Sequence, residues 1–511
     1  DATANVTLTA GNLTMNDALS DVTVTTGTFV ANDLTGAGVG NGDLTVNGGT
    51  ATVRNVARNV AVNNGANVTV AGDVTGNIDG NGASTITLGD GTTGGNVLQG
   101  QNIVVTGDRT FDGTWAATNL QVDGDNTLKF TNGAANIGAT NISTTATNKE
   151  QNFEVAHDQI ITGNWGSAAN PLGNLHVTDV GGKDITINTA NSHISVTTAK
   201  NDTTRVIFSH AAGGELRSIG GNGIRVNETR FAENGKVSGG TNSKDINVIA
   251  GKKAILGGKI QGVTLNLNGA GSILDLENGF TLDTTITAGI GDEGIVNVLG
   301  VGDVVVGKDI GTSGTRVRDV NFFTDNNITG QVLNFGSKVY ASGEIAIEKH
   351  NTFKAINENV VLDAPEVKAS NASFDLGSTG KITVNGGTLT FSGEEGKISV
   401  KIAQFGNKIS GGQIVAGKNS KLEYKENAAI TITLDDSSGS SRPVAGENSE
   451  FAIIKNDTGN DAIGSLNVAF DESKNSFTKW SSRFENGTLI LTQKDAAADK
   501  IKEILEKRLD T

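Results

Sequence analysis

The chain has 511 residues, with 69 Gly, 3 Pro, no Cys, 1 Met and only 5% aromatic residues. The absence of Cys excludes disulfide frameworks, thiolate metal sites and thiol nucleophiles, and the Gly residues do not follow the Gly-x-y period of collagen. The net charge of −15 argues against nucleic acid as a partner, because phosphate binding needs a basic surface. No run of about 18 apolar residues predicts a membrane-spanning helix.

The repeating element is a short strand, a turn rich in Gly and Asn, and a second short strand. It occurs as LTVNGGTATV at 44–53 and again as ITVNGGTLTF at 382–391. Apolar residues two apart predict strands with one buried face, and Asn and Gly tolerate the positive φ of a corner. Variants with longer turns occupy 60–70, 122–130, 265–276 and 415–424.

This pattern fits antiparallel hairpins in a sandwich or barrel, or corners between the parallel strands of a solenoid. A sandwich closes within about 100 to 250 residues, whereas the pattern runs from about residue 5 to 435 without a linker. We therefore predict an all-β fold, a right-handed parallel β-helix over 1–436, with roughly 20 residues per coil. A seam or protruding loop is expected near 148–173, which holds Trp165 and Pro171.

The C-terminal part has a different pattern. After a polar loop at 435–447, longer alternating strands and a predicted Asn486-Gly487 hairpin turn indicate a capping module over 437–493. Residues 494–511 predict a short amphipathic α-helix with Asp495 as its N-cap. Aromatic side chains concentrate in the capping module, which suggests that they cover the end of the β-helix: Phe451, Phe470, Phe477, Trp480 and Phe484.

Strand-rich coils, a capping module and a terminal helix, in this order and without Cys, resemble the passenger of a bacterial autotransporter. The segment IITGNWGSAANPLGNLHV at 160–177 is similar to a phrase that recurs in rickettsial surface antigens of the outer-membrane protein A and B type. The resemblance implies export through the periplasm, an autochaperone-like role for the cap, and a helix that leads toward the protein's own C-terminal outer-membrane β-barrel. No barrel sequence follows Thr511, so it also implies a released or truncated passenger.

Several motifs resemble parts of functional sites, and we favour a structural explanation for each. Residues 302–308 and 412–418 contain most of a phosphate loop but lack the Ser or Thr after Lys and a following helix. Residues 38–46 resemble a calcium-binding repeat, with Asn41 where that repeat has Gly. The five His residues lack zinc-site spacing: His157, His176, His193, His210 and His350.

Acidic pairs and a basic stretch are the other candidates. A glycoside-cleaving pair needs carboxyl groups about 5–10 Å apart, and usually aromatic platforms, which the middle of the chain lacks. The Lys-rich stretch is interspersed with Glu and predicts a mixed surface. The acids are Asp123/Asp125, Glu394-Glu395 and Asp435-Asp436, and the bases are Lys397, Lys401, Lys408, Lys418, Lys421 and Lys425.

We therefore predict no catalytic, cofactor-binding or metal-binding residue and no cofactor. The resemblance implies a non-enzymatic adhesin, exposed on the bacterial surface or secreted, that binds a host cell-surface protein or glycan or associates with its own copies. A surface-layer or structural coat protein is the first alternative. A polysaccharide-processing β-helix or a phage-type fibre is the second.

Overall fold

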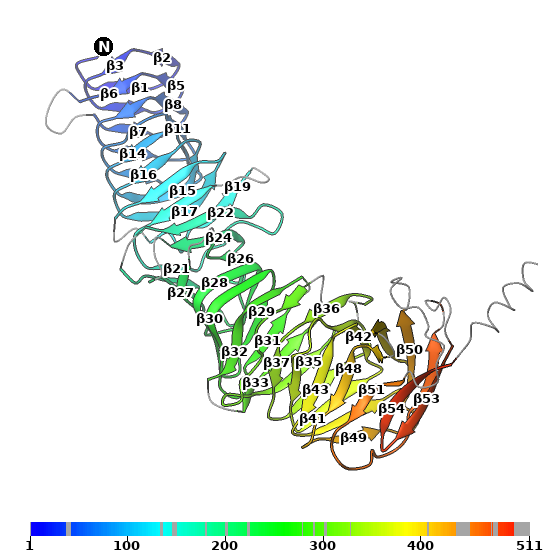
Figure 1. Cartoon of the computed structure of the whole chain (residues 1–511). Coiled ribbons are helices and arrows are strands. Elements are labelled where there is room, and N and C mark those ends of the chain that lie inside the picture. The colour runs from blue at the N-terminus through cyan, green and yellow to red at the C-terminus, as the bar shows by residue number, and fades with distance from the viewer. Residues whose placement is uncertain are drawn as a thin grey trace, which may run out of the picture. The chain divides into compact units, whose positions relative to one another are not determined.

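The computed structural model describes residues 2–494, apart from 37–41, 133–135, 146–150, 179–180, 200–202, 222–224, 278, 290–291, 301–303, 326, 328, 406–407, 436–449, 472 and 474–478. The chain divides into two compact units, Asp1–Ile246 and Asn247–Thr511. Both are built from short strands stacked in successive coils (Figure 1).

Unit 1 begins with three strands per coil, so that each strand pairs with the strand three places later in the chain. Its strands are β1 (Val6–Leu8), β2 (Asn12–Thr14), β3 (Asp17–Ala18), β4 (Val22–Val24), β5 (Thr28–Val30), β6 (Asp33–Leu34), β7 (Leu44–Val46), β8 (Thr50–Val53), β9 (Asn55–Val56), β10 (Val60–Val62), β11 (Asn67–Val70), β12 (Ile78–Gly80), β13 (Thr85–Leu88), β14 (Gly91–Thr93), β15 (Val97–Val105), β16 (Arg109–Phe111), β17 (Trp115–Val122), β18 (Thr127–Phe130), β19 (Asn141–Thr144), β20 (Asn152–Val155), β21 (Gln159–Ile161), β22 (Leu172–Val177), β23 (Asp184–Ile187), β24 (Ile194–Ala199), β25 (Arg205–Phe208), β26 (Glu215–Ile219) and β27 (Val226–Phe231).

Strand β28 (Gly235–Ile249) contains the division, and unit 2 continues in the same parallel manner. Its strands are β29 (Lys253–Leu256), β30 (Lys259–Asn268), β31 (Ile273–Leu276), β32 (Thr281–Ala288), β33 (Glu293–Val298), β34 (Val304–Val306), β35 (Val317–Phe322), β36 (Val332–Phe335), β37 (Lys338–Tyr340), β38 (Glu344–Ile347), β39 (Thr352–Ala355), β40 (Val360–Asp363), β41 (Glu366–Ser370), β42 (Ser373–Gly377), β43 (Lys381–Asn385), β44 (Thr388–Ser392), β45 (Gly396–Lys401), β46 (Ala403–Phe405), β47 (Lys408–Ser410), β48 (Gln413–Ala416), β49 (Lys421–Tyr424), β50 (Ala429–Asp435), β51 (Glu450–Asn456), β52 (Asn467–Asp471), β53 (Lys479–Glu485) and β54 (Thr488–Lys494).

The pairing between successive coils is parallel, which confirms the predicted β-helix. Strands β1, β4 and β7 pair through Val6, Val22 and Leu44, at intervals of 16 and 22 residues. In unit 2, strands β38, β41 and β44 pair through Glu344, Glu366 and Thr388, at intervals of 22 residues. Inward side chains alternate with outward ones along most strands, as the apolar spacing predicted.

Asn and Asp side chains at the corners connect each coil of unit 1 to the next. The Oδ1 atom of Asn59 accepts the backbone N–H of Asn77 at 2.8 Å, Asn77 accepts that of Asn96 at 2.7 Å, and Asn96 accepts that of Thr114 at 2.8 Å. A second series runs along another corner: Asp73 to Thr92, Asp90 to Asp108, and Asp108 to Thr127. These bonds satisfy corner N–H groups that strand pairing leaves without a partner, which explains the high Asn and Asp content.

The two identical NGGT turns take different backbone conformations. At 47–50 the second glycine, Gly49, has a φ of 81°, whereas at 385–388 the first glycine, Gly386, has a φ of 81°. A Cβ on Gly387 would lie 2.0 Å from the backbone oxygen of Ala364 in the neighbouring coil, so both glycines of the second turn are required. The repeated sequence predicted the corner but not its geometry.

The prediction that aromatic side chains gather at the C-terminal end is wrong for the buried ones. In unit 1, the rings of Phe208 and Phe231 stack with their centroids 4.7 Å apart. In unit 2, the rings of Phe335, Phe353 and Phe374 follow one another at 5.2 and 6.3 Å. Paired strands place these residues in register, so the aromatic side chains form inward stacks along both cores.

Trp165, which suggested a protruding loop, belongs to the core. Its side chain is fully buried, and its backbone bridges Ile142 in one neighbouring coil and Ser192 in the other. Arg109 is also buried, with its side chain inside the corner of unit 1. Its guanidinium donates to the oxygens of Gly72 and Gly89 at 2.9 and 3.0 Å, and burial lowers the pKa of Arg109 to about 10. It remains charged at neutral pH and connects three coils.

The capping module contains the predicted antiparallel strands. Strand β51 pairs with β48 in parallel and with β54 in antiparallel orientation, and β53 and β54 form a hairpin. Asn486 and Gly487 have φ values of 48° and 78°, which confirms the predicted hairpin turn. The phenol of Tyr424 in β49 donates to the oxygen of Gly487 at 3.0 Å and connects the hairpin to the preceding coil. The predicted helix after residue 494 and the loop at 437–449 lie outside the described residues.

Replacing Asn77 by Ala should open the corner at Asn96. The substitution leaves the backbone N–H of Asn96 without its acceptor, at a cost of roughly 1–3 kcal/mol. Hydrogen exchange measured by mass spectrometry should show about tenfold or greater acceleration in the peptide containing Asn96. Asn77→Asp keeps an acceptor and should change exchange little, and Asn81→Ala, at an exposed turn, is the matched control. Equal acceleration in N77A and N81A would contradict the corner bond.

The capping module should lose stability at alkaline pH through Tyr424. Burial raises the pKa of the Tyr424 phenol, so above about pH 10 the unfolded chain loses this proton while the folded chain keeps it. The free energy of unfolding therefore falls as pH rises through that range. Tyr424→Phe should lower the melting temperature at pH 8 by removing the bond to Gly487, but its melting temperature should fall less steeply above about pH 10. Parallel melting curves, followed by circular dichroism, would refute this assignment.

Candidate binding surfaces

Unit 2 has an open surface depression of about 560 Å³, which we call the charged hollow. It crosses several successive coils: Lys349 and His350 follow β38, Ser373 begins β42, and Thr431 lies in β50. Strands β39, β42, β45 and β50 pair in this order, so side chains far apart in sequence are adjacent in the stack. Its lining is Thr329, Lys349, His350, Asn371, Ser373, Glu394, Glu395, Lys397 and Thr431.

Asn371 shapes the centre of the charged hollow. It has a φ of 48°, and its Oδ1 accepts the backbone N–H of Glu395 at 2.7 Å. The carboxylate of Glu395 lies 3.8 Å from the ammonium of Lys349, but both side chains are more than half exposed, so this pair adds little stability. Asn371 therefore fixes the backbone, while the charged side chains remain accessible to a ligand.

The charged hollow unites candidates that the sequence suggested separately. Glu394-Glu395 is one of the predicted acidic pairs, Lys397 begins the predicted basic stretch, and His350 is one of the five His residues. The lining contains no aromatic side chain, so it lacks a platform for stacking a sugar ring. Both signs of charge side by side favour a polar ligand or protein surface that carries both.

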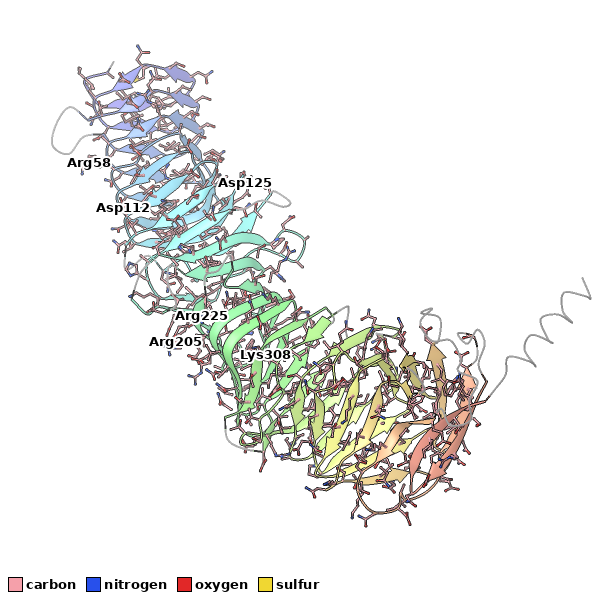
Figure 2. The ribbon with its side chains drawn as sticks, in the orientation of Figure 1. Arg58, Asp112, Asp125, Arg205, Arg225 and Lys308 are labelled. Carbon is pink, nitrogen blue, oxygen red and sulfur yellow. The ribbon has the colours of Figure 1, made fainter. Side chains whose placement is uncertain are left out.

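Unit 1 has a second depression, of about 520 Å³, which we call the amide groove. It lies over β13, β15, β17 and β19, whose outward residues form two rows. Figure 2 shows Asp125 on the flank that bears β11 and β19, and Arg58 and Asp112 on the opposite flank. The groove is lined by Thr85, Asn102, Ile103, Val104, Asn119, Gln121, Asn141, Ile142, Ser143, Asn164 and Gly166.

The remaining motifs have structural explanations in the described residues. Strand β48 fills 413–416 between the two glycines of the second phosphate-loop match, so those residues are extended rather than wrapped around a phosphate. His176 Nδ1 lies 2.8 Å from the hydroxyl of Thr198, and Lys425 pairs with Glu423 at 2.7 Å. Asp435 ends β50. Asp436 and residues 38–41 and 302–303 lie outside the described residues.

Among the described residues, no three His, Cys, Asp or Glu side chains cluster in a way that holds a metal ion. Within the same part of the chain, no helix is long and apolar enough to span a membrane.

Comparison with known proteins yields one structural likeness. No family model and no curated protein matches the chain. The chain is similar to the crystal structure of the Haemophilus influenzae Hap adhesin, with 12% sequence identity and a TM-score of 0.36, over 93% of this chain and 64% of that one. The match thus spans less than two thirds of the Hap chain, and so loose a superposition carries no functional argument. The strand pairings themselves establish the parallel β-helix.

Asn371 offers a test of how the charged hollow is held. Asn371→Ala removes the acceptor for Glu395 and also places an unfavourable residue at a φ of 48°, whereas Asn371→Gly removes only the acceptor. We expect N371A to be less stable than N371G by about 1 kcal/mol, and both variants to show faster hydrogen exchange at Glu395. Equal stability of the two variants, measured by denaturant unfolding, would show that the backbone relaxes.

Proposed function

We propose that this chain is the surface-displayed passenger of a bacterial autotransporter and acts as a non-enzymatic adhesin. The parallel β-helix with a C-terminal antiparallel module is the observation that carries the proposal. Such a stack grows one coil at a time on a preformed edge, and a chain without Cys crosses an oxidising periplasm without forming disulfide crosslinks. The proposed autochaperone-like role of β51 to β54 follows from the same geometry, because these strands extend the sheet ending in β48.

The segment 160–177 supports the family resemblance in physical terms. Its apolar positions Ile161, Leu172 and Leu175 are buried. A Cβ at Gly163 would lie 2.2 Å from the backbone oxygen of Thr140, and Gly166 has a φ of 71°. The phrase therefore encodes one coil of the β-helix rather than a binding motif, so binding must depend on outward-facing residues.

The two depressions are the surfaces that we assign to attachment. Each is built from several coils, so each needs the folded stack. A host cell-surface protein or glycan is the proposed partner, and surface exposure or secretion is the proposed location. A structural coat remains the first alternative and predicts ordered assembly of copies.

Attachment should be tested with fluorescent microspheres coated with the purified chain. The coated spheres should bind epithelial cells saturably, and excess soluble chain should reduce binding by more than half. Glu394→Gln with Glu395→Gln in the charged hollow preserves side-chain volume and tests its charges, with the exposed Glu358→Gln as a matched control.

Ordered self-assembly in light scattering without any cell binding would favour the coat. Hydrolysis of a polysaccharide that the double Gln variant abolishes would favour the enzyme and overturn the proposal.

A further inference from the structure

The outward residues of the amide groove form two continuous rows. Strand pairing aligns Thr85, Asn102, Asn119 and Asn141 in the first row. It aligns Val104, Gln121 and Ser143 in the second. Neighbouring members of a row are separated by one coil, about 4.8 Å. The face thus presents the same kind of group at a fixed interval along the stack.

The amides of the first row are oriented by one another. Asn119 Nδ2 donates to Asn102 Oδ1 at 3.4 Å, Asn141 Nδ2 donates to Asn119 Oδ1 at 3.2 Å, and the backbone N–H of Asn164 donates to Asn141 Oδ1 at 3.0 Å. A primary amide has two N–H donors and a carbonyl with two lone pairs, so such a chain of bonds fixes each amide without using its whole capacity. The row is a preorganised line of paired donors and acceptors.

The lining is free of charge in a chain whose net charge is −15. The adjacent carboxylate of Asp123 accepts from Gln121 Nε2 at 3.0 Å and from the hydroxyl of Thr145 at 2.6 Å. No lining side chain offers a cation to an anionic ligand, and Asp123 repels one. These electrostatics select a ligand that is polar but neutral.

We infer that the amide groove binds a neutral glycan chain lying along the stack. Sugar hydroxyls both donate and accept, as amides do, and a linear pyranose chain repeats at an interval close to the spacing of the coils. Val104, half buried in the second row, offers an apolar contact for the C–H face of a ring. The volume of about 520 Å³ falls within the range of about 300–1,000 Å³ typical of ligand sites.

An extended peptide fits the same face less well. Its residues repeat at about 3.3 Å, so side chains on one face repeat at about 6.6 Å and fall out of step with rows about 4.8 Å apart. A second copy of this chain has the right spacing, since amide rows can pair with each other. That occupant is separated from the glycan by the experiment below.

The inference deepens the adhesin function proposed above by naming its ligand class. The test uses the full chain and immobilised neutral linear hexasaccharides of glucose, galactose or N-acetylglucosamine, with a heparin-derived hexasaccharide as the charged counterpart. Wild-type chain should bind at least one neutral probe, with little change between about 0.05 and 0.3 M salt. Asn102→Thr with Asn119→Thr should weaken that binding about tenfold or more. The change to Thr suits the strand, because Thr85 already occupies this row.

Asn67→Thr is the matched control, because Asn67 lies in the same row two coils from Asn102 and outside the groove lining. It should bind as wild type does. Thermal unfolding by circular dichroism verifies that both variants are folded, and Ser143→Glu, on the exposed second row, provides a test that leaves the amide bonds intact and should also weaken binding.

Binding to the heparin probe alone, or equal loss in N67T and the double variant, would overturn the inference. Loss of self-association in the double variant without any glycan binding would assign the groove to a second copy instead. If microspheres coated with the double variant still attach to cells like wild type, the adhesin proposal stands and the groove inference fails. If wild-type chain binds the neutral probe but no cell, the groove inference stands and the adhesin proposal fails.

Discussion

Parallel backbone hydrogen bonding between successive coils is the interaction on which the rest of the structure depends. Once β10 pairs with β7 and β12, and β11 with β8 and β13, every inward residue lies above an inward residue and every outward residue above an outward one. The corners must then repeat closely enough to keep the strands in register. Asn and Asp side chains achieve this by accepting an N–H from the following coil.

The same stacking creates both the core and the binding surfaces. On the inside, it aligns rings such as Phe208 and Phe231 and encloses the guanidinium of Arg109 with backbone oxygens from two other coils. On the outside, it aligns amides into a row in unit 1 and gathers charges from separate corners in unit 2. Residues about 20 places apart in sequence are therefore neighbours, so a local motif search cannot find these sites.

The incorrect sequence-based expectations share one physical cause. Trp165 suggested a loop because it lies between a Gly-rich turn and Pro171, but its backbone bridges two coils and its ring fills the core. The aromatic residues looked concentrated near the C-terminus because a linear count cannot show which rings stack. Both depend on the length of each coil, which varies from one coil to the next, from 16 to 22 residues between β1, β4 and β7.

The sequence by itself determined the all-β class, the parallel stacking, the corners rich in Gly and Asn, and the Asn486-Gly487 hairpin, because these depend on residues close together in the chain. It also supplied Glu394, Glu395, Lys397 and His350, but as unrelated candidates. Only the tertiary structure decided that these residues share one hollow and that Asn102, Asn119 and Asn141 form one row. Coil-to-coil register decides these neighbours, and it is set by backbone pairing between segments that no local pattern connects.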